Sequence, residues 1–236
     1  MATQPAVGTA AGTGRGMRDR FRGQVRDEVK AAALRQLADG GPQAVSINSI
    51  ARELGVTGPA LYRYVTGREQ LLEALALDAY TDLAAALRAA GGRRGSPAAR
   101  LRAVAHAYRR WALDQPHRYR LLFAPAAPGA DAHTPALVEA ASASLQVLVG
   151  VLTDLAPGLP VPGPPALREQ LDRLEAARGG HADPGLTLVA VSLWCRLHGL
   201  VGIELGGNTA SMGLDAALLL DSAVDEVLDR LGGPAA

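Results

Sequence analysis

Residues 34–75 of the chain read LRQLADGGPQAVSINSIARELGVTGPALYRYVTGREQLLEAL. Gly-Gly-Pro at residues 40–42 ends an amphipathic helix expected over residues 20–39, where apolar positions recur every three or four residues. Ser46 provides a side-chain cap for a second helix of about two turns, which ends at Gly55. The stretch therefore predicts short helices separated by tight turns.

A third helix follows the turn after Gly55. Thr57 is its expected cap, and Pro59 falls in its first turn, where the missing backbone N–H is harmless. Tyr62 and Arg63 lie away from the apolar face of this helix. A short helix, a tight turn and a second helix with one free face are the parts of a helix-turn-helix motif.

Further helices are expected along the rest of the chain. Thr66 and Glu69 have the spacing of a capping box for a fourth helix. Beyond it, apolar periodicity and helix-initiating prolines predict helices over residues 97–114, 116–123, 135–155, 165–178, 184–206 and 214–231. Because no alternating strand pattern accompanies them, the predicted fold class is all-α.

The helices group into two domains behind a leader. Residues 1–17 are rich in Gly, Ala and Thr, and we expect them to be disordered in the free protein. Residues 18–66 are expected to form a small three-helix domain that contains the helix-turn-helix motif at about residues 46–65. Residues 67–236 are expected to form a larger helical domain.

The composition excludes several classes of protein. Hydrophobic residues make up 48% of the 236 residues, which is typical of a globular chain. The single cysteine, Cys195, excludes an intrachain disulfide framework and the usual spacings of a zinc site. The apolar stretch at residues 186–207 is interrupted by Arg196, His198 and Glu204, and the N-terminus lacks the apolar block of a signal peptide. We therefore expect a cytoplasmic protein with no membrane partner, no metal and no cofactor.

Basic residues gather near the N-terminus, although the net charge of the chain is only +1. They are Arg15, Arg18, Arg20, Arg22, Arg26 and Lys30. A solvated charge run is one interpretation of this arm. The helix-turn-helix pattern that follows favours another, namely contact with the phosphates of double-stranded DNA.

Candidate DNA-binding residues are drawn from the arm, the helix starts and the third helix. They are Arg18, Arg20, Arg22, Ser46, Ser49, Thr57, Gly58, Pro59, Ala60, Tyr62, Arg63, Tyr64, Thr66 and Arg68. The small residues at 58–60 make the third helix slim enough to enter the major groove, which is about 12 Å wide. Arg63 carries the donor fork that suits guanine or phosphate, and the hydroxyls near helix N-termini suit phosphate.

The same stretch resembles the DNA-binding domain of the tetracycline-repressor (TetR) family. The resemblance rests on Gly-Gly-Pro at 40–42, Ile-Ala-x-Glu-Leu-Gly-Val at 50–56, Leu-Tyr at 61–62 and Arg-Glu-x-Leu-Leu at 68–72. It implies a fold of about nine or ten helices, a homodimer, and a C-terminal domain that both dimerises and holds a small-molecule cavity. That ligand-binding and dimerisation domain corresponds to residues 67–236 here.

A second resemblance lies near the C-terminus. Trp-Cys-Arg-Leu-His-Gly-Leu at residues 194–200 is similar to the Trp, His-Gly signature of one C-terminal TetR subclass. Gly202 and Gly206 allow close approach of another helix, and the final helix is amphipathic. The last two helices of two copies are therefore expected to form a four-helix dimer interface; the alternative is that their apolar surface completes the core of one monomer.

A mostly apolar effector pocket is expected in the larger domain. Its candidate lining residues are Tyr108, Trp111, Tyr119, Leu122, Phe123, Val147, Val151, Trp194 and His198. Plain core packing is the alternative for each aromatic residue. His106 is a second possible polar anchor, or a solvated residue beside Arg102 and Arg109. An apolar pocket favours an uncharged or aromatic lipophilic effector.

The function favoured by these features is that of a ligand-responsive repressor, released from a palindromic DNA operator by a small-molecule effector. Alternatives are a co-repressor-dependent regulator, an activator, a helix-turn-helix that contacts only proteins, and a metal sensor using Cys195 and His198 with His181 or Asp183. A helical enzyme would have to use Cys195 with His198 or Glu204. No nucleophile motif or phosphate loop is present, so we expect no catalytic residues.

Overall fold

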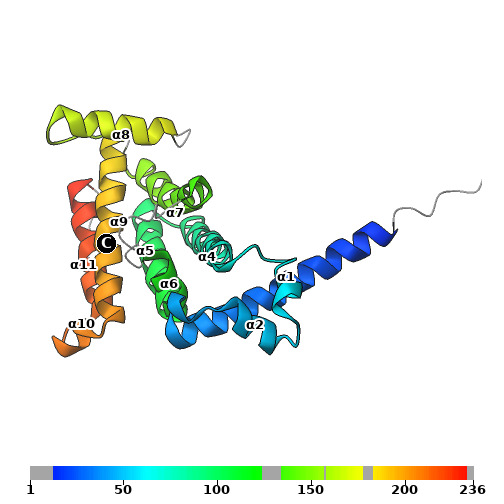
Figure 1. Cartoon of the computed structure of the whole chain (residues 1–236). Helices are drawn as coiled ribbons and strands as arrows, with labels where there is room; N and C mark the ends of the chain where they lie inside the picture. The colour runs from blue at the N-terminus through cyan, green and yellow to red at the C-terminus, as the bar shows by residue number, and fades with distance from the viewer. Residues whose placement is uncertain (1–12, 124–133, 157, 178–182, 233–236) are drawn as a thin grey trace, which may run out of the picture. The chain divides into compact units, whose positions relative to one another are not determined.

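The computed structural model describes residues 13–123, 134–156, 158–177 and 183–232, with side chains of the first helix from Arg20 onward (Figure 1). This described part consists of helices and their connections and contains no strand, which confirms the all-α prediction. The chain divides into two compact units, residues 1–75 and residues 76–236. The division falls inside a helix, whereas the sequence places the domain boundary at 66/67.

The first unit contains the predicted helix-turn-helix. Its elements are α1 (Thr13–Gly40), the 3₁₀ turn η1 (Pro42–Ala44), α2 (Ile47–Glu53), α3 (Gly58–Leu61) and the beginning of α4 (Arg68–Gly91). The apolar faces of these elements form a small core whose buried members are Val29, Ala32, Ala33, Leu37, Val45, Ile47, Ile50, Ala51, Leu61, Leu71 and Leu75. The regularly spaced apolar residues that predict α1 and α2 therefore supply the buried side chains of this core.

The turn between α2 and α3 is closed by a C-terminal glycine motif. Gly55 adopts φ of 67°, and its N–H donates to the carbonyl of Arg52 at 3.2 Å. The N–H of Val56 reaches back to the carbonyl of Ala51 at 2.9 Å. These are the two hydrogen bonds of a Schellman motif, in which the left-handed residue is normally glycine because a Cβ is strained there.

The three helix caps predicted for this unit have different outcomes in the structure. Ser46 caps α2 by accepting from the Ser49 N–H, as predicted, and Thr57 occupies the N-cap of α3 without a side-chain cap bond. The predicted capping box of Thr66 with Glu69 is wrong, because the Thr66 N–H donates to Oε1 of Gln70 at 3.1 Å and α4 begins at Arg68.

The first helix also begins earlier than the sequence indicates. Residues 13–17, which were predicted to belong to the disordered leader, form the beginning of α1. Residues 1–12 of that leader lie outside the described residues. The prediction of α1 used apolar periodicity, which is lost before Phe21 even though the helix continues through polar residues. The short segments η1 and α10 (Asn208–Ser211) were not predicted either, because neither contains enough residues to show a period.

The second unit contains the remaining helices. After residues 76–91 of α4 they are α5 (Pro97–Asp114), α6 (Pro116–Phe123), α7 (Pro135–Thr153), α8 (Pro165–Ala177), α9 (Pro184–Leu205), α10 and α11 (Ala216–Arg230). The predicted ranges agree with these bounds to within two residues. Five of the helices begin at a proline, which supplies a helical φ and lacks only an N–H that would have no partner there.

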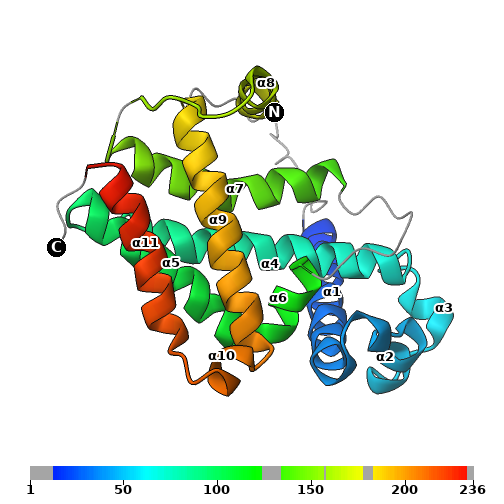
Figure 2. The same ribbon diagram turned by 90° about the vertical axis from the view of Figure 1, so that its left-hand side faces the viewer.

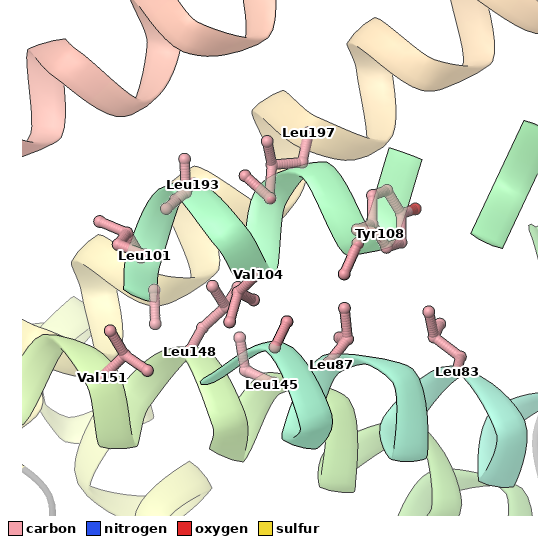
Figure 3. Packing of buried hydrophobic residues seen from close by; sticks show 14 of the residues in the cluster. Leu83, Leu87, Leu101, Val104, Tyr108, Leu145, Leu148, Val151, Leu193 and Leu197 are labelled. Atoms are coloured by element: carbon pink, nitrogen blue, oxygen red, sulfur yellow. The ribbon is translucent and has the colours of Figure 1, made fainter. Parts of the chain in front are cut away.

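The core of this unit lies between α4, α5, α7 and α9 (Figure 3). Close-packed side chains from the four helices meet there: Leu83, Leu87, Leu101, Val104, Tyr108, Leu145, Leu148, Val151, Leu193 and Leu197. Each buried leucine contributes about 1.5–3 kcal/mol relative to an exposed one. The polar positions on the same helices are thereby forced to the surface or to a cavity.

Two of these helices are apolar enough to be compared with membrane spans. α7 and α9 are long enough, and each has a mean hydropathy of 1.6 over its most apolar window. In the second unit, however, α9 packs against α5, α7 and α11, and α9 and α11 run side by side and antiparallel (Figures 1 and 2). Both helices therefore pack against other helices of the second unit.

The glycine at residue 55 provides a test of this fold. We expect Gly55→Ala to lower the free energy of unfolding by about 1 kcal/mol, because alanine is strained at positive φ. Gly23 lies within α1 with no atom near its would-be Cβ, so Gly23→Ala should raise the free energy of unfolding by about 0.5–1 kcal/mol. Denaturant unfolding of the full chain, followed by circular dichroism, measures both; equal effects of the two substitutions would contradict the assignment of Gly55.

Candidate functional site

The first candidate site is the exposed side of α3 and of the turn that follows it. Leu61 is buried, whereas the side chain of Tyr62 is 53% exposed and Arg63 is also exposed. Helical hydrogen bonding continues beyond α3, since the N–H of Val65 donates to the carbonyl of Leu61 at 3.2 Å. The segment thus presents Tyr62 and Arg63 on a short rigid helical support.

The slim beginning of α3 also has a packing role. A Cβ at Gly58 would lie 3.3 Å from Oδ1 of Asn48 on α2. A larger residue would therefore force α2 and α3 apart or displace the Asn48 side chain. Pro59 is exposed and Ala60 is half-buried, so the remaining side chains of this turn are short.

The hydroxyl residues near the helix starts are at or near the surface. Ser46, Thr57 and Thr66 are exposed, and Ser49 is half-buried. The Ser46 hydroxyl already accepts from the Ser49 N–H at 3.4 Å, which leaves its own proton available as a donor. Each position is compatible with a phosphate contact.

Arg68 is placed differently from the other candidates. Its Nε donates to the carbonyl of Val45 at 3.1 Å, and its Nη2 donates to the carbonyl of Pro42 at 2.6 Å. The guanidinium therefore ties the start of α4 to η1. The position of Arg68 near a helix start predicted a phosphate contact. In the structure, two donor groups of its guanidinium are bonded to backbone carbonyls of the first unit.

The basic arm lies on α1. Arg20 and Arg22 are exposed there, and the side chain of Arg18 lies outside the described residues. Farther along α1, Arg26 and Lys30 share a surface pocket of about 310 Å³ with Tyr64 and residues of α4. The sequence indicated all three residues separately, but only the fold brings the two cations of α1 beside Tyr64.

The second candidate site is a cavity of about 530 Å³ in the second unit. Most of its lining is apolar: Leu122, Val138, Ala141, Leu145, Leu174 and Val191. Three aromatic residues, Tyr80, Phe123 and Trp194, and the polar residues Ser142 and His198 complete it. The described lining contains no Asp, Glu, Lys or Arg.

His198 is the most constrained polar group of this cavity. Its Nδ1 lies 3.1 Å from the hydroxyl of Tyr108 and 3.0 Å from the hydroxyl of Tyr119, and the Tyr119 hydroxyl also donates to the His198 carbonyl at 3.1 Å. Burial lowers the pKa of His198, so the ring is neutral at pH 7. Burial raises the pKa of both tyrosines, which therefore keep their protons.

Aromatic rings surround this histidine. The Phe123 ring packs edge-on against it with centroids 4.4 Å apart, and Tyr119 stacks on it at 5.5 Å. Trp194 packs against Tyr108 at 4.9 Å. Residues of α5, α6 and α9 are thus joined into one aromatic cluster at the wall of the cavity.

The predicted pocket residues divide into three groups. Leu122, Phe123, Trp194 and His198 line the cavity, and Tyr108 and Tyr119 lie behind it, bonded to His198. The others, Trp111, Val147 and Val151, belong to the core or its edge and are not among the lining residues. Residues with no sequence signal of their own, such as Tyr80, Ser142 and Leu174, line the cavity because of helix packing alone.

His106 is neither a cavity residue nor a free surface residue. Its Nε2 lies 2.7 Å from Oδ1 of Asp221 on α11. Arg102 and Arg109, on the same side of α5, pair with Asp225 and Glu204. This row of pairs joins α5 to α11 and α9.

The residues considered for a metal or for catalysis are not gathered into one site. Among the residues that the structure describes, no group of three or more His, Cys, Asp or Glu side chains is placed to hold an ion; His181 is outside them. Cys195 is exposed on α9, whereas His198 has its Nδ1 engaged by tyrosines. Asp183 caps α9 by accepting from the N–H groups of Gly185 and Leu186.

Known proteins resemble both units. A family model for bacterial regulatory proteins of the tetR family matches residues 30–75, and one for the tetracyclin repressor-like C-terminal domain matches residues 101–227. The HTH-type transcriptional regulator Rv1816 of Mycobacterium tuberculosis is 28% identical over 218 residues, covering 88% of this chain and 92% of its own length.

Solved structures agree with these matches. The crystal structure of the regulatory protein SCO4313 superposes with a TM-score of 0.76 at 37% identity, covering 89% of this chain and 98% of that one. A tetR-family transcriptional regulator from Streptomyces coelicolor has the same fold, with a TM-score of 0.59 at 23% identity over 86% of this chain and 78% of that one. With the helix-turn-helix of the first unit and the helical second unit, these findings show that the chain belongs to the TetR family of DNA-binding transcriptional regulators.

Proposed function

We propose that the protein is a homodimeric repressor that binds a palindromic operator and releases it when a small molecule fills the cavity of the second unit. The observation that carries this proposal is the cavity of about 530 Å³, with an apolar lining and a single constrained histidine, in the same chain as a helix-turn-helix. Residues 18–66 would then bind DNA and residues 67–236 would bind effector and dimerise. Such a regulator acts in the cytoplasm, where the DNA is.

The exposed side of α3 is assigned to the major groove. Tyr62 and Arg63 are the side chains available for base contacts, because Leu61 is buried and the preceding turn has only short side chains. Ser46, Ser49, Thr57 and Thr66, with Arg20 and Arg22 on α1, are assigned to phosphates. Phosphate contacts set affinity and salt dependence, whereas base contacts set sequence preference.

Dimerisation is assigned to α9 and α11. On α9, Cys195, Gly199 and Ile203 follow one another along an exposed face, and Ile203 is 44% exposed. On α11, Leu218 is 67% exposed. Large apolar side chains at such exposure on adjacent helices favour contact with a second copy, and a twofold dimer places two recognition helices about 34 Å apart on successive major-groove turns.

The release mechanism depends on different effector affinities of two conformations. α4 is a candidate for the connecting element, because Arg68 in its first turn is bonded to η1 and Tyr80, farther along the same helix, lines the cavity. If effector weakens operator binding, operator must weaken effector binding by the same factor. An effector that strengthens operator binding would instead make the protein a co-repressor-dependent regulator.

A DNA selection tests the proposed recognition surface. We expect the purified protein to enrich a palindromic sequence from a random duplex library, and Arg63→Ala to change the preference at specific base pairs at a cost of about 1–3 kcal/mol. Arg22→Ala should weaken binding to all DNA sequences alike. It should also reduce the slope of log binding constant against log salt concentration by about 1. Arg110→Ala, at an exposed position of the second unit, is the control. Failure to enrich any sequence would contradict operator binding.

A charge placed on α11 tests the proposed dimer. Leu218→Glu should convert the dimer to a monomer and lower operator affinity, because a carboxylate would be buried without a partner at the contact. Phe21→Glu is the matched control, since Phe21 is also an exposed apolar residue but lies on α1. Analytical ultracentrifugation measures the association of both variants. A Leu218→Glu protein that sediments as the wild type does would exclude this interface.

A further inference from the structure

We propose that the first unit contains a binding site for a small organic anion, separate from the cavity of the second unit. The site is the surface pocket of about 310 Å³ that is lined by residues of α1, of the turn after α3 and of the beginning of α4. Its charges, its hydrogen-bond donors and its apolar residues together define the ligand class. The inference goes beyond the proposed function, because it concerns a second ligand site in the same chain.

The charged residues that line this pocket are cations. Arg26 and Lys30 are four residues apart on α1, so their side chains lie on one face of that helix. The described lining contains no Asp or Glu, although Asp27, Glu69 and Glu73 are adjacent to lining residues in the sequence. A cleft lined by charges of one sign attracts ions of the opposite sign. The pocket therefore favours an anion.

Arg26 contributes a guanidinium whose charge is not balanced within the described part of the chain. Its side chain is exposed, and no described residue forms a hydrogen bond or an ion pair with it. Arg35, farther along α1, differs because it is paired with Glu53. A guanidinium binds a carboxylate or a phosphate through parallel N–H donors. A ligand that carries either group would supply the partner of Arg26.

Two neutral side chains of the lining add hydrogen-bond donors. The backbone N–H of Thr66 can only donate, so Oε1 of Gln70 faces it at 3.1 Å. The NH₂ group is therefore the end of the Gln70 amide that is left for a ligand. Tyr64 carries a hydroxyl that can also donate to an oxyanion. These donors reinforce the preference for a carboxylate or a phosphate ester.

The remaining lining residues are apolar, namely Val65, Leu71 and Ala74. Leu71 is only 2% exposed and belongs to the small core of the first unit, so the pocket extends from the cations to the edge of that core. An apolar ligand group gains free energy when it leaves water for such a surface. A DNA phosphate between two sugars has no such group to place there. An aromatic or aliphatic anion has both parts.

Three probes separate the charge of the ligand from its apolar body. 2-Naphthoate has both, 2-naphthamide has the same rings without the charge, and dimethyl phosphate has the charge of a DNA phosphodiester without the rings. In NMR titrations of the full chain with labelled methyl groups, we expect naphthoate to shift the signals of Val65, Leu71 and Ala74. It should bind about fourfold or more tightly than either other probe.

Three results of these titrations would overturn the proposal. The first is equal binding of naphthamide, which would show that the cations do not contribute. The second is the absence of shifts at Val65, Leu71 and Ala74, including the case in which only signals of the second cavity respond, such as those of Val191 and Leu174. The third is binding of dimethyl phosphate as tight as that of naphthoate, which would assign the pocket to the DNA backbone.

Variants of the two cations assign the preference to this pocket. Arg26→Ala and Lys30→Ala should each weaken naphthoate binding about two- to fivefold, as expected for exposed ion pairs. Arg26→Lys should lose less than Arg26→Ala, because it keeps the charge. Arg52→Ala is the matched control, since Arg52 is an exposed cation of α2 outside the pocket lining. Equal weakening by Arg52→Ala, or unchanged affinity in both alanine variants of the pocket, would overturn the assignment.

The titrations contain no DNA, so they are independent of operator binding. If naphthoate binds here but the protein selects no operator, the anion site stands and the proposed repressor function fails. If the protein selects an operator but naphthoate does not shift the pocket residues, the anion site is wrong and the proposed function stands.

Discussion

One imidazole nitrogen links three helices around the cavity of the second unit. Nδ1 of His198 is bonded to tyrosines from α5 and α6, so a single residue of α9 fixes three helices around the cavity wall. These groups are inside an apolar bundle, where a missing partner costs about 1–3 kcal/mol, and the arrangement is therefore strongly specified. The cavity is the space that the core leaves on the other side of this cluster.

In the first unit, hydrogen bonds to backbone groups hold the short elements around the small apolar core. Gly55 closes the turn between α2 and α3 through a Schellman motif, and Arg68 holds η1 by two carbonyl oxygens. Both devices fix elements that are too short to be stable alone, since short helices depend on tertiary support. Tyr62 and Arg63, which directly follow α3, take no part in these contacts; their side chains are exposed and remain available for recognition.

Much of the fold could be predicted from the sequence, and the reason is visible at its helix starts. Five helices of the second unit begin at a proline, and Gly55 and Ser46 mark the turn and cap of the helix-turn-helix. The residues of the candidate site were harder to predict from the sequence. Trp194, His198 and Phe123 were indicated by residue type, but Tyr80 and Leu174 face the cavity because of helix packing, which no local pattern reports. Arg68 showed the opposite problem, because its charge suggested DNA while its contacts are internal.

Cys195 has a chemical consequence for any solution of this protein. It is the single cysteine of the chain, and its side chain is exposed on the α9 face that also carries Gly199 and Ile203. A disulfide between cysteines of this chain can therefore form only between two molecules. In a reducing compartment the thiol stays free. In air, a disulfide between two Cys195 thiols would join two molecules covalently through their α9 helices.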